Sequence, residues 1–422
     1  MLNIITLFLM IIWGVIISVI YLYDKNTLGS NLTPFNILIL PIYLITFITY
    51  IMSLCSEVKY LHTNTILIFI IFTILFRFLG GVGEYLANNL YKKNKKITFN
   101  TSKVDKLMYI LGVFSVSILL LDFINKIRKF PKVSFIVNEG FQAQYTGGVN
   151  FYLRLICFFC VIYFLGTYKK GKKKNILVAI LFLLPIFLTF VKGMIIMPCV
   201  GGAIMYCIIN NKNLKLKNIL LVSVLGIFFF LIVYFIEITI WDKNNIYDIS
   251  TYKTMSDKFI SYLTSGIQSF NYNISNNLFF NVDIVDNPIF SPFIKFLSKF
   301  NIVESNGYIP SNQAAIYSVF SNEYKYSNVN SFFGTLLLYS GWFKSIFMVG
   351  FISIYSYFLL IRAKYNQDLV SKLIYSTFAS GLVMGWFEYY YLQTFWVYMI
   401  CIIEIIKIYI CKFYRVGGGV LE

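Results

Sequence analysis

The stretch NIITLFLMIIWGVIISVIYLY, residues 3–23, carries no charged side chain. A helix of about 20 apolar residues crosses the ~30 Å hydrocarbon core of a bilayer, and comparable runs recur along the 422-residue chain. The chain is 58% hydrophobic and 13% charged, whereas a soluble domain carries about 25% charged residues. We therefore predict an all-α fold, a polytopic bundle of membrane-spanning helices.

The apolar runs predict about eleven transmembrane helices, with one large external loop between the eighth and the ninth. The predicted spans lie at residues 3–23, 34–54, 62–80, 105–124, 149–168, 175–191, 193–210, 218–240, 343–361, 371–387 and 393–411. The first run has no basic segment before it and no small-residue cleavage site after it, so we expect a span and not a signal peptide.

The predicted organisation has three parts and a short tail. Residues 1–240 hold the first eight helices, residues 241–342 form the external loop with interfacial helices, and residues 343–415 hold the last three helices. The final segment, 416–422, contains the sequence GGGVLE and is expected to be the remnant of a cloning linker.

Basic tracts set the predicted orientation. The formal net charge is +18, and most of it lies in short tracts between apolar runs, such as YKKNKK at 91–96 and KKGKKK at 169–174. Cytoplasmic loops attract such tracts, so we expect an external N-terminus, a cytoplasmic C-terminus, contacts with membrane lipids and no nucleic-acid partner. The outward loop 125–148 breaks this rule with Lys126, Arg128, Lys129 and Lys132, and handling of phosphate is one reason for such a departure.

The external loop is rich in tyrosine and in side-chain amides, which suits carbohydrate. Sugar rings stack on aromatic faces, while amide and hydroxyl groups bond sugar hydroxyls. The candidate sugar-binding residues are Tyr262, Gln268, Asn271, Asn328 and Asn330. The alternative is a lid of amphipathic helices lying in the membrane interface, where tyrosine and tryptophan also concentrate.

Cations near the outer boundary are candidate ligands for a diphosphate. Arg154 lies within NFYLRLICFF, about one turn inside its span, and Lys192 lies at an outer hairpin, while Arg128 belongs to the outward loop. Arginine offers a bidentate fork for phosphate. The alternative is that these side chains snorkel to lipid headgroups, which is also our expectation for Arg77 at the cytoplasmic end of its span.

Two outward carboxylates beside aromatic residues are candidate general bases. Glu388 lies in GWFEYYYLQ and Glu139 in VNEGFQAQY, and either could accept a proton from a hydroxyl. The sole histidine, His62, is expected to be structural. Asp-x-Asp pairs are absent from the sequence, so we expect neither a metal nor a cofactor.

Four short motifs carry a resemblance to a known family. NVNSFFGTLLLYSGWFKSIF (328–347) is similar to the segment that closes the large external loop of Wzy-type oligosaccharide repeat-unit polymerases, although Tyr339 stands where that family has an aspartate. SYLTSGIQSFNYNI (261–274), TFVKGMIIM (189–197) and GSNLTPFNILIL (29–40) resemble further segments of the same family, with Lys192 at the position of an arginine.

The resemblance implies a GT-C-like bundle and a metal-independent membrane glycosyltransferase. Such an enzyme joins undecaprenyl-diphosphate-linked oligosaccharide repeat units at the outer face of the bacterial cytoplasmic membrane, for capsule, O-antigen or exopolysaccharide. Its candidate partners are a chain-length regulator and a flippase. Three alternatives stay open: an O-antigen-ligase-like glycosyltransferase, a flippase or other transporter of lipid-linked oligosaccharides, and a structural or assembly subunit.

Overall fold

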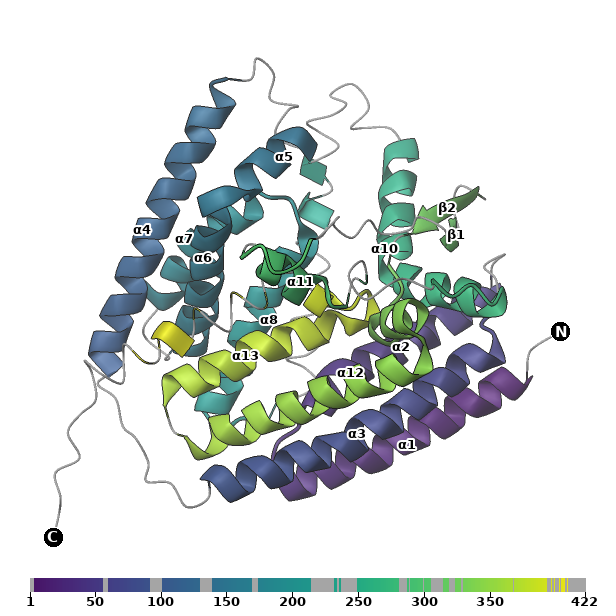
Figure 1. Ribbon diagram of the computed structural model, residues 1–422. Coiled ribbons are helices and arrows are strands. Elements are labelled where there is room, and N and C mark those ends of the chain that lie inside the picture. Colours follow the sequence, from purple (N-terminus) through teal and green to yellow (C-terminus); the bar gives the residue numbers. More distant parts are fainter. Residues whose placement is uncertain are drawn as a thin grey trace, which may run out of the picture. The chain divides into compact units, whose positions relative to one another are not determined.

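The computed structural model (Figure 1) describes most of the chain. The described residues are 4–55, 60–91, 101–129, 139–168, 174–213, 231–233, 235–236, 249–280, 287, 289–298, 300–304, 314–318, 323–327, 329–366, 368–392, 396, 398, 402, 404–406 and 408. Of the eleven predicted spans, those at 218–240 and 393–411 lie mostly outside them.

Long apolar helices dominate the described residues. Seven of the helices there are long and apolar enough to cross a membrane. They are α1 (Ile4–Leu28), α2 (Pro34–Cys55), α3 (Thr63–Tyr91), α4 (Thr101–Ile127), α6 (Gly148–Gly166), α8 (Lys192–Ile209) and α12 (Phe332–Tyr365). A shorter apolar helix, α7 (Lys174–Phe187), corresponds to the sixth predicted span. The prediction of a helical membrane protein is confirmed.

The remaining described elements are one further long helix and several shorter elements. They are α5 (Glu139–Thr146), α10 (Ile249–Ser275), α11 (Ser291–Ser298), α13 (Leu369–Val383) and two 3₁₀ turns, η2 (Met384–Trp386) and η3 (Tyr390–Leu392). One antiparallel hairpin, β1 (Ala314–Ser318) with β2 (Glu323–Ser327), departs from the predicted all-α class. Helices α10 and α11 lie within the predicted external loop, where interfacial helices are expected.

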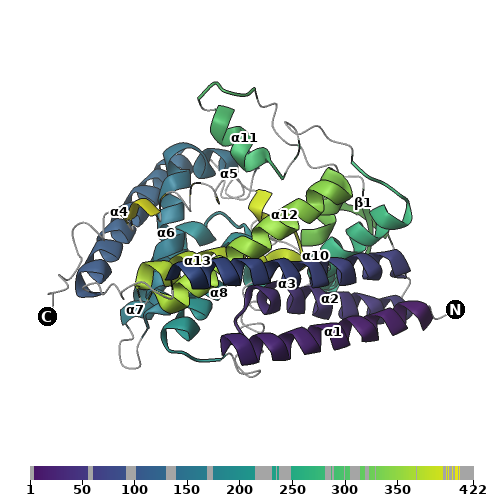
Figure 2. The ribbon, with the colours of Figure 1, turned by 60° about the horizontal axis from the view of Figure 1, so that its bottom comes forward.

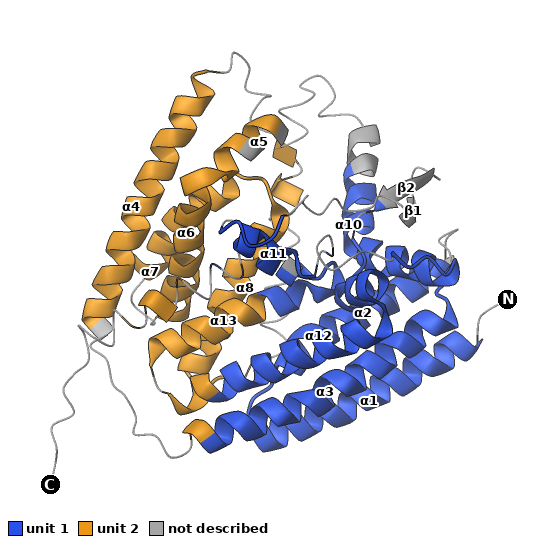
Figure 3. Ribbon diagram, in the orientation of Figure 1, with its two compact units in different colours: residues 1–89, 249–361, 381–398 blue, residues 90–248, 362–380, 399–422 orange. Residues whose placement is uncertain are grey.

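The chain forms two compact units (Figure 3). Unit 1 comprises residues 1–89, 249–361 and 381–398. Unit 2 comprises residues 90–248, 362–380 and 399–422. Unit 1 therefore combines the first three helices with most of the predicted external loop and most of α12.

An aromatic core joins the helices of unit 1. The ring of Trp13 on α1 stacks on Phe69 of α3 with centroids 5.4 Å apart, and α1 and α3 run side by side in Figures 1 and 2. The Phe69 ring also meets Phe270 of α10 at 5.3 Å. Phe72 of α3 stacks on Phe333 of α12 at 5.2 Å. Each such pair adds about 0.5–1.5 kcal/mol beyond area burial, so the interior of unit 1 fixes α10 and α12 against α3.

Helix α12 is broken at Gly341, where φ is 67° and ψ is 179°. A residue with a Cβ is strained at such a φ, so a glycine at this position lets the backbone bend. The break frees carbonyl groups that neighbouring residues satisfy: Phe280 N donates to Leu338 O (2.8 Å), and Asn287 Nδ2 donates to Tyr339 O (2.9 Å). The sequence placed the start of this span at residue 343, whereas the structure adds a buried helical segment from Phe332 to Ser340.

Unit 2 is built on α4, α6, α7 and α8. At one end, α5 covers the ends of α4 and α7 through a cluster of Phe123, Phe141 and Tyr145, with Leu188 packed against it. The Tyr145 hydroxyl and the Gln142 amide donate to backbone carbonyls at the end of α7 and just beyond it. The short helix α5 is thereby fixed to the end of unit 2 that carries the predicted cations.

Candidate functional site

Glu388 lies between η2 and η3, beside the segment that leads into α12. Its backbone forms a parallel bridge with Ser331, and Ser331 N donates to Phe387 O at 3.0 Å. Ser331 has a φ of 60°, which turns the chain sharply just before the helix begins. These contacts place a carboxylate from the C-terminal part of the chain at the N-terminus of α12.

Hydrogen-bond donors surround the Glu388 carboxylate. Its Oε1 accepts from the Tyr389 backbone N–H at 2.7 Å and from the Thr335 hydroxyl. The backbone N–H of Asn330 donates to the same carboxylate. The side chain is half-buried, and this burial raises the pKa of Glu388 to about 7, although the three hydrogen bonds oppose the shift. A general base works best with a pKa near the operating pH, so the structure supports Glu388 as a candidate base.

Aromatic rings from α10 and from the Glu388 segment pack together. The Tyr262 ring stacks on Phe387 with centroids 4.3 Å apart, and it meets Trp386 at 6.1 Å. The Tyr390 hydroxyl hydrogen-bonds to the Tyr262 side chain, and burial holds the pKa of Tyr390 well above its usual value. Gly266 permits this approach, because a Cβ there would lie 2.4 Å from Phe387 O. The predicted sugar-binding residue Tyr262 thus packs against the residues that directly precede Glu388, and part of its side chain is exposed.

The predicted sugar-binding amides Asn330 and Gln268 both form hydrogen bonds with residues of α10. Asn330 is 2% exposed, and its Oδ1 accepts from Ser269 Oγ (2.7 Å) and Asn273 Nδ2 (2.9 Å). Gln268 donates to Thr264 Oγ1 at 2.6 Å and is also buried. These bonds lie inside unit 1, so both amides are already engaged without a sugar.

Asn271 is engaged in the same way. Its Oδ1 accepts from His62 N (2.6 Å) and Thr65 Oγ1 (2.9 Å), and its Nδ2 donates to Tyr60 O (3.1 Å). These three hydrogen bonds join α10 to the first turn of α3 and to the segment before it. Asn328, the fifth predicted sugar-binding residue, lies outside the described residues.

The predicted diphosphate-binding cations belong to unit 2. Arg154 is half-buried, and its guanidinium donates to the backbone carbonyls of Asn150 (3.3 Å) and Thr146. Within the described ranges of unit 2, no carboxylate forms an ion pair with Arg154, whereas Lys126 pairs with Asp122 at 2.7 Å. A buried cation without a carboxylate partner is suited to a bound anion.

The other predicted residues of unit 2 lie at helix ends. Lys192 is the first residue of α8 and is half-buried. Arg128 follows α4 and is exposed. Glu139 begins α5, but its side chain is outside the described part of the structure. Glu388 therefore belongs to unit 1, and the second candidate base and the three cations belong to unit 2.

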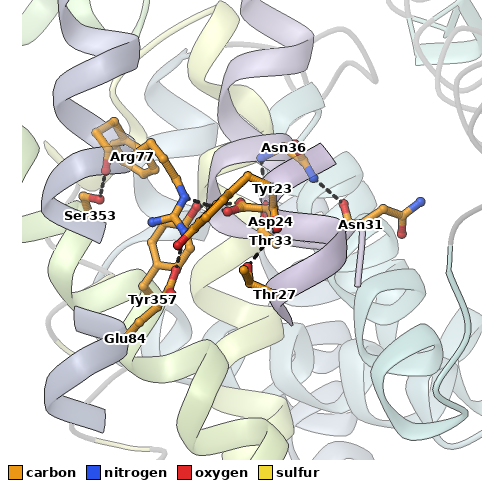
Figure 4. A network of polar contacts seen from close by, with 11 residues as sticks. Tyr23, Asp24, Thr27, Asn31, Thr33, Asn36, Arg77, Glu84, Ser353 and Tyr357 are labelled. Carbon is orange, nitrogen blue, oxygen red and sulfur yellow. Dashed lines mark hydrogen bonds and ion pairs between the residues drawn. The ribbon is translucent and has the colours of Figure 1, made fainter. Parts of the chain in front are cut away.

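A second polar cluster lies within unit 1 (Figure 4). Arg77 of α3 donates through Nε to Asp24 Oδ1 of α1 at 2.6 Å, and its Nη2 lies 2.9 Å from Glu84 Oε1. The Tyr357 hydroxyl of α12 donates to Asp24 Oδ2 at 2.9 Å. Asp24 and Tyr357 are fully buried, and Arg77 is 9% exposed. The expectation that Arg77 snorkels to lipid headgroups is wrong, because its charge is neutralised inside the helix bundle.

Sequence reasoning missed the partners that organise both clusters. Thr335 holds Glu388 across 53 positions, and Tyr357 meets Asp24 across 333 positions. The sequence did contain one signal: Asp24 directly follows the first apolar run. An arginine buried in a helix bundle, such as Arg77, requires a counter-ion of this kind. For metals, the described residues contain no group of three or more His, Cys, Asp or Glu side chains that could hold an ion.

The comparisons with known proteins identify a family without assigning a function. Residues 60–415 match the model of DUF6337, a family of unknown function, and the chain belongs to this family. No curated protein and no solved structure matches the chain. The matched range begins just before α3, so Asp24 lies outside it.

Proposed function

We propose that this DUF6337 protein is a bacterial polysaccharide polymerase of the cytoplasmic membrane, with Glu388 as its general base. In this proposal it joins undecaprenyl-diphosphate-linked oligosaccharide repeat units at the outer face. One observation carries the proposal: a half-buried carboxylate with a pKa raised to about 7 is held beside aromatic rings in a helical membrane protein. The motif resemblance to Wzy-type polymerases supplies the substrate class.

The proposed reaction is a glycosyl transfer. Glu388 takes the proton from an acceptor hydroxyl, whose oxygen forms a new bond to the anomeric carbon of the growing chain. The bond from that carbon to the lipid diphosphate breaks, and its electron pair leaves with the diphosphate. Charge developing on the leaving diphosphate requires cations in a metal-independent enzyme.

Specific observations favour a second candidate, a transporter of lipid-linked oligosaccharide. Membrane transporters place discontinuous helices and buried ionisable residues along their substrate pathways. Unit 1 contains both features, because α12 breaks at Gly341 and Arg77 is buried with Asp24 and Glu84. An O-antigen-ligase-like enzyme would use the chemistry of the first proposal with another acceptor.

The test is Glu388→Gln, which keeps the shape of the side chain but removes its basicity. The polymerase proposal predicts loss of polymer, accumulation of single lipid-linked units on the outer leaflet and a normal protein level. Glu304→Gln is the control, since Glu304 is an exposed carboxylate of the same unit. Wild-type polymer from the Glu388→Gln variant would show that Glu388 is not the general base. Lipid-linked units retained on the inner leaflet would favour the transporter.

A further inference from the structure

We propose that Thr335 is the positioning residue for Glu388, fixing the orientation of the carboxylate and stabilising its ionised form. The catalytic meaning of this inference rests on the proposed function, whereas the contact itself does not. Thr335 touches no predicted substrate group and acts through Glu388.

The geometry leaves the Thr335 hydroxyl little freedom. Thr335 is 1% exposed and lies in the first turn of α12, where its backbone N–H donates to Ser331 O at 3.0 Å. A β-branched side chain in a helix has few χ1 rotamers, and here the hydroxyl donates to Glu388 Oε1. Because Tyr389 N donates to the same oxygen at 2.7 Å, one carboxylate oxygen is held by two donors.

The segment before Thr335 is also held by contacts that do not involve Glu388. Asn330 is pinned to α10 by Ser269 and Asn273, and Ser331 Oγ accepts from Gly334 N at 3.3 Å. The N-terminus of a helix also favours negative charge. Thr335 therefore presents its hydroxyl from a segment that is held to α10 and by its own helix N-terminus as well as by Glu388.

The groups facing Glu388 are otherwise neutral. Tyr389 and Tyr390 adjoin it along the chain, and burial holds the pKa of each tyrosine above its usual value. From α10, Tyr262 contributes a neutral ring packed on Phe387. Across the residues that the structure describes, no Lys or Arg forms an ion pair with Glu388. Burial thus raises the pKa of Glu388, and the hydrogen bonds from Thr335 and two backbone N–H groups lower it.

Removal of the hydroxyl should therefore move the titration of Glu388 in one direction. Thr335→Val keeps the shape of the side chain but removes a donor from the ionised carboxylate. A hydrogen bond to a charged group corresponds to about one to two pH units, so the pKa of Glu388 should rise by about that much. Thr335→Ser keeps the donor and should restore the wild-type value.

Infrared titration of the purified full-length protein in lipid nanodiscs tests this inference without any activity assay. The absorption of the protonated carboxyl group is assigned to Glu388 by its disappearance in Glu388→Gln. We expect the midpoint to rise in Thr335→Val and to stay near the wild-type value in Thr335→Ser. It should also stay unchanged in Thr46→Val, which removes a buried hydroxyl that bonds only its own helix.

The pH profile of polymer formation by the same variants gives the second readout. In Thr335→Val the profile should move to higher pH together with the infrared midpoint. An unshifted infrared midpoint in Thr335→Val overturns the positioning role. A shifted midpoint with polymer formation intact in Glu388→Gln would keep the role of Thr335 and reject only the proposed function.

Discussion

The buried cluster around Arg77 offers the sharpest test of how unit 1 holds together. Asp24→Asn removes the carboxylate that Arg77 Nε contacts at 2.6 Å, in a pair whose side chains are 10% and 0% exposed. Removing one partner of a buried ion pair costs about 3–5 kcal/mol, because the other charge stays buried. Arg77 retains Glu84 at 2.9 Å, so we expect the lower end of that range.

Such a loss is large against a total stability of about 5–15 kcal/mol. The assay is denaturant unfolding of the purified protein in mixed micelles, together with the protein level in membranes. Glu84→Gln should cost less than Asp24→Asn, since Glu84 is partly exposed whereas Asp24 is fully buried. Lys25→Gln is the control, because Lys25 is an exposed neighbour of Asp24.

The exchange Asp24→Arg with Arg77→Asp should recover part of the stability that either single change removes. An unfolding free energy within about 0.5 kcal/mol of wild type in Asp24→Asn, the range of ordinary surface substitutions, would refute the reasoning.

Four further predictions concern the site and the topology. Gly341→Val should lower stability by about 1–3 kcal/mol, as expected for a non-glycine residue held in a strained conformation, and should shorten the polymer; unchanged unfolding and unchanged polymer would contradict the break. Gly266→Ala should abolish polymer, because its Cβ would meet Phe387 O at 2.4 Å and displace the Glu388 segment; wild-type polymer length on gels would reject this packing. Lys192→Ala should leave single lipid-linked units at a normal protein level, whereas Lys192→Arg should keep activity; equal activity of both variants removes the diphosphate role. In intact cells, an impermeant thiol reagent should label Asn276→Cys but not Lys212→Cys, both at exposed positions, and the reverse pattern would invert the topology.

The sequence was most informative where apolar runs are uninterrupted. For α1 and α2, span boundaries set by hydropathy lie within a few residues of the helices, because the bilayer thickness imposes the length. For α12, the predicted start at 343 was late, since the polar residues before it and Gly341 concealed a first helical segment. Local pattern cannot show that a loop donates to the carbonyls freed at such a break.

For the candidate site too, local features could be predicted from the sequence, whereas long-range contacts could not. Glu388 could be selected from the sequence as a carboxylate beside aromatic residues, because that feature is local. Its contact with Thr335 depends on tertiary packing, because the two residues are 53 positions apart. The same holds for the hydrogen bond between Asn271 and His62, which are 209 positions apart. Composition suggested that the amides of α10 bind sugar, but it could not distinguish an exposed amide from one that is buried and already bonded.

The pH dependence of polymer formation by the purified protein, with lipid-linked repeat units as substrate, tests the central claim most directly. Burial raises the pKa of Glu388 to about 7, and a general base acts only when it is deprotonated. The rate should therefore increase about tenfold per pH unit below pH ~7 and level off above it, and Glu388→Gln should abolish this dependence together with the activity. A rate that is flat across pH 7, or a Glu388→Gln protein with the wild-type profile, would contradict the account.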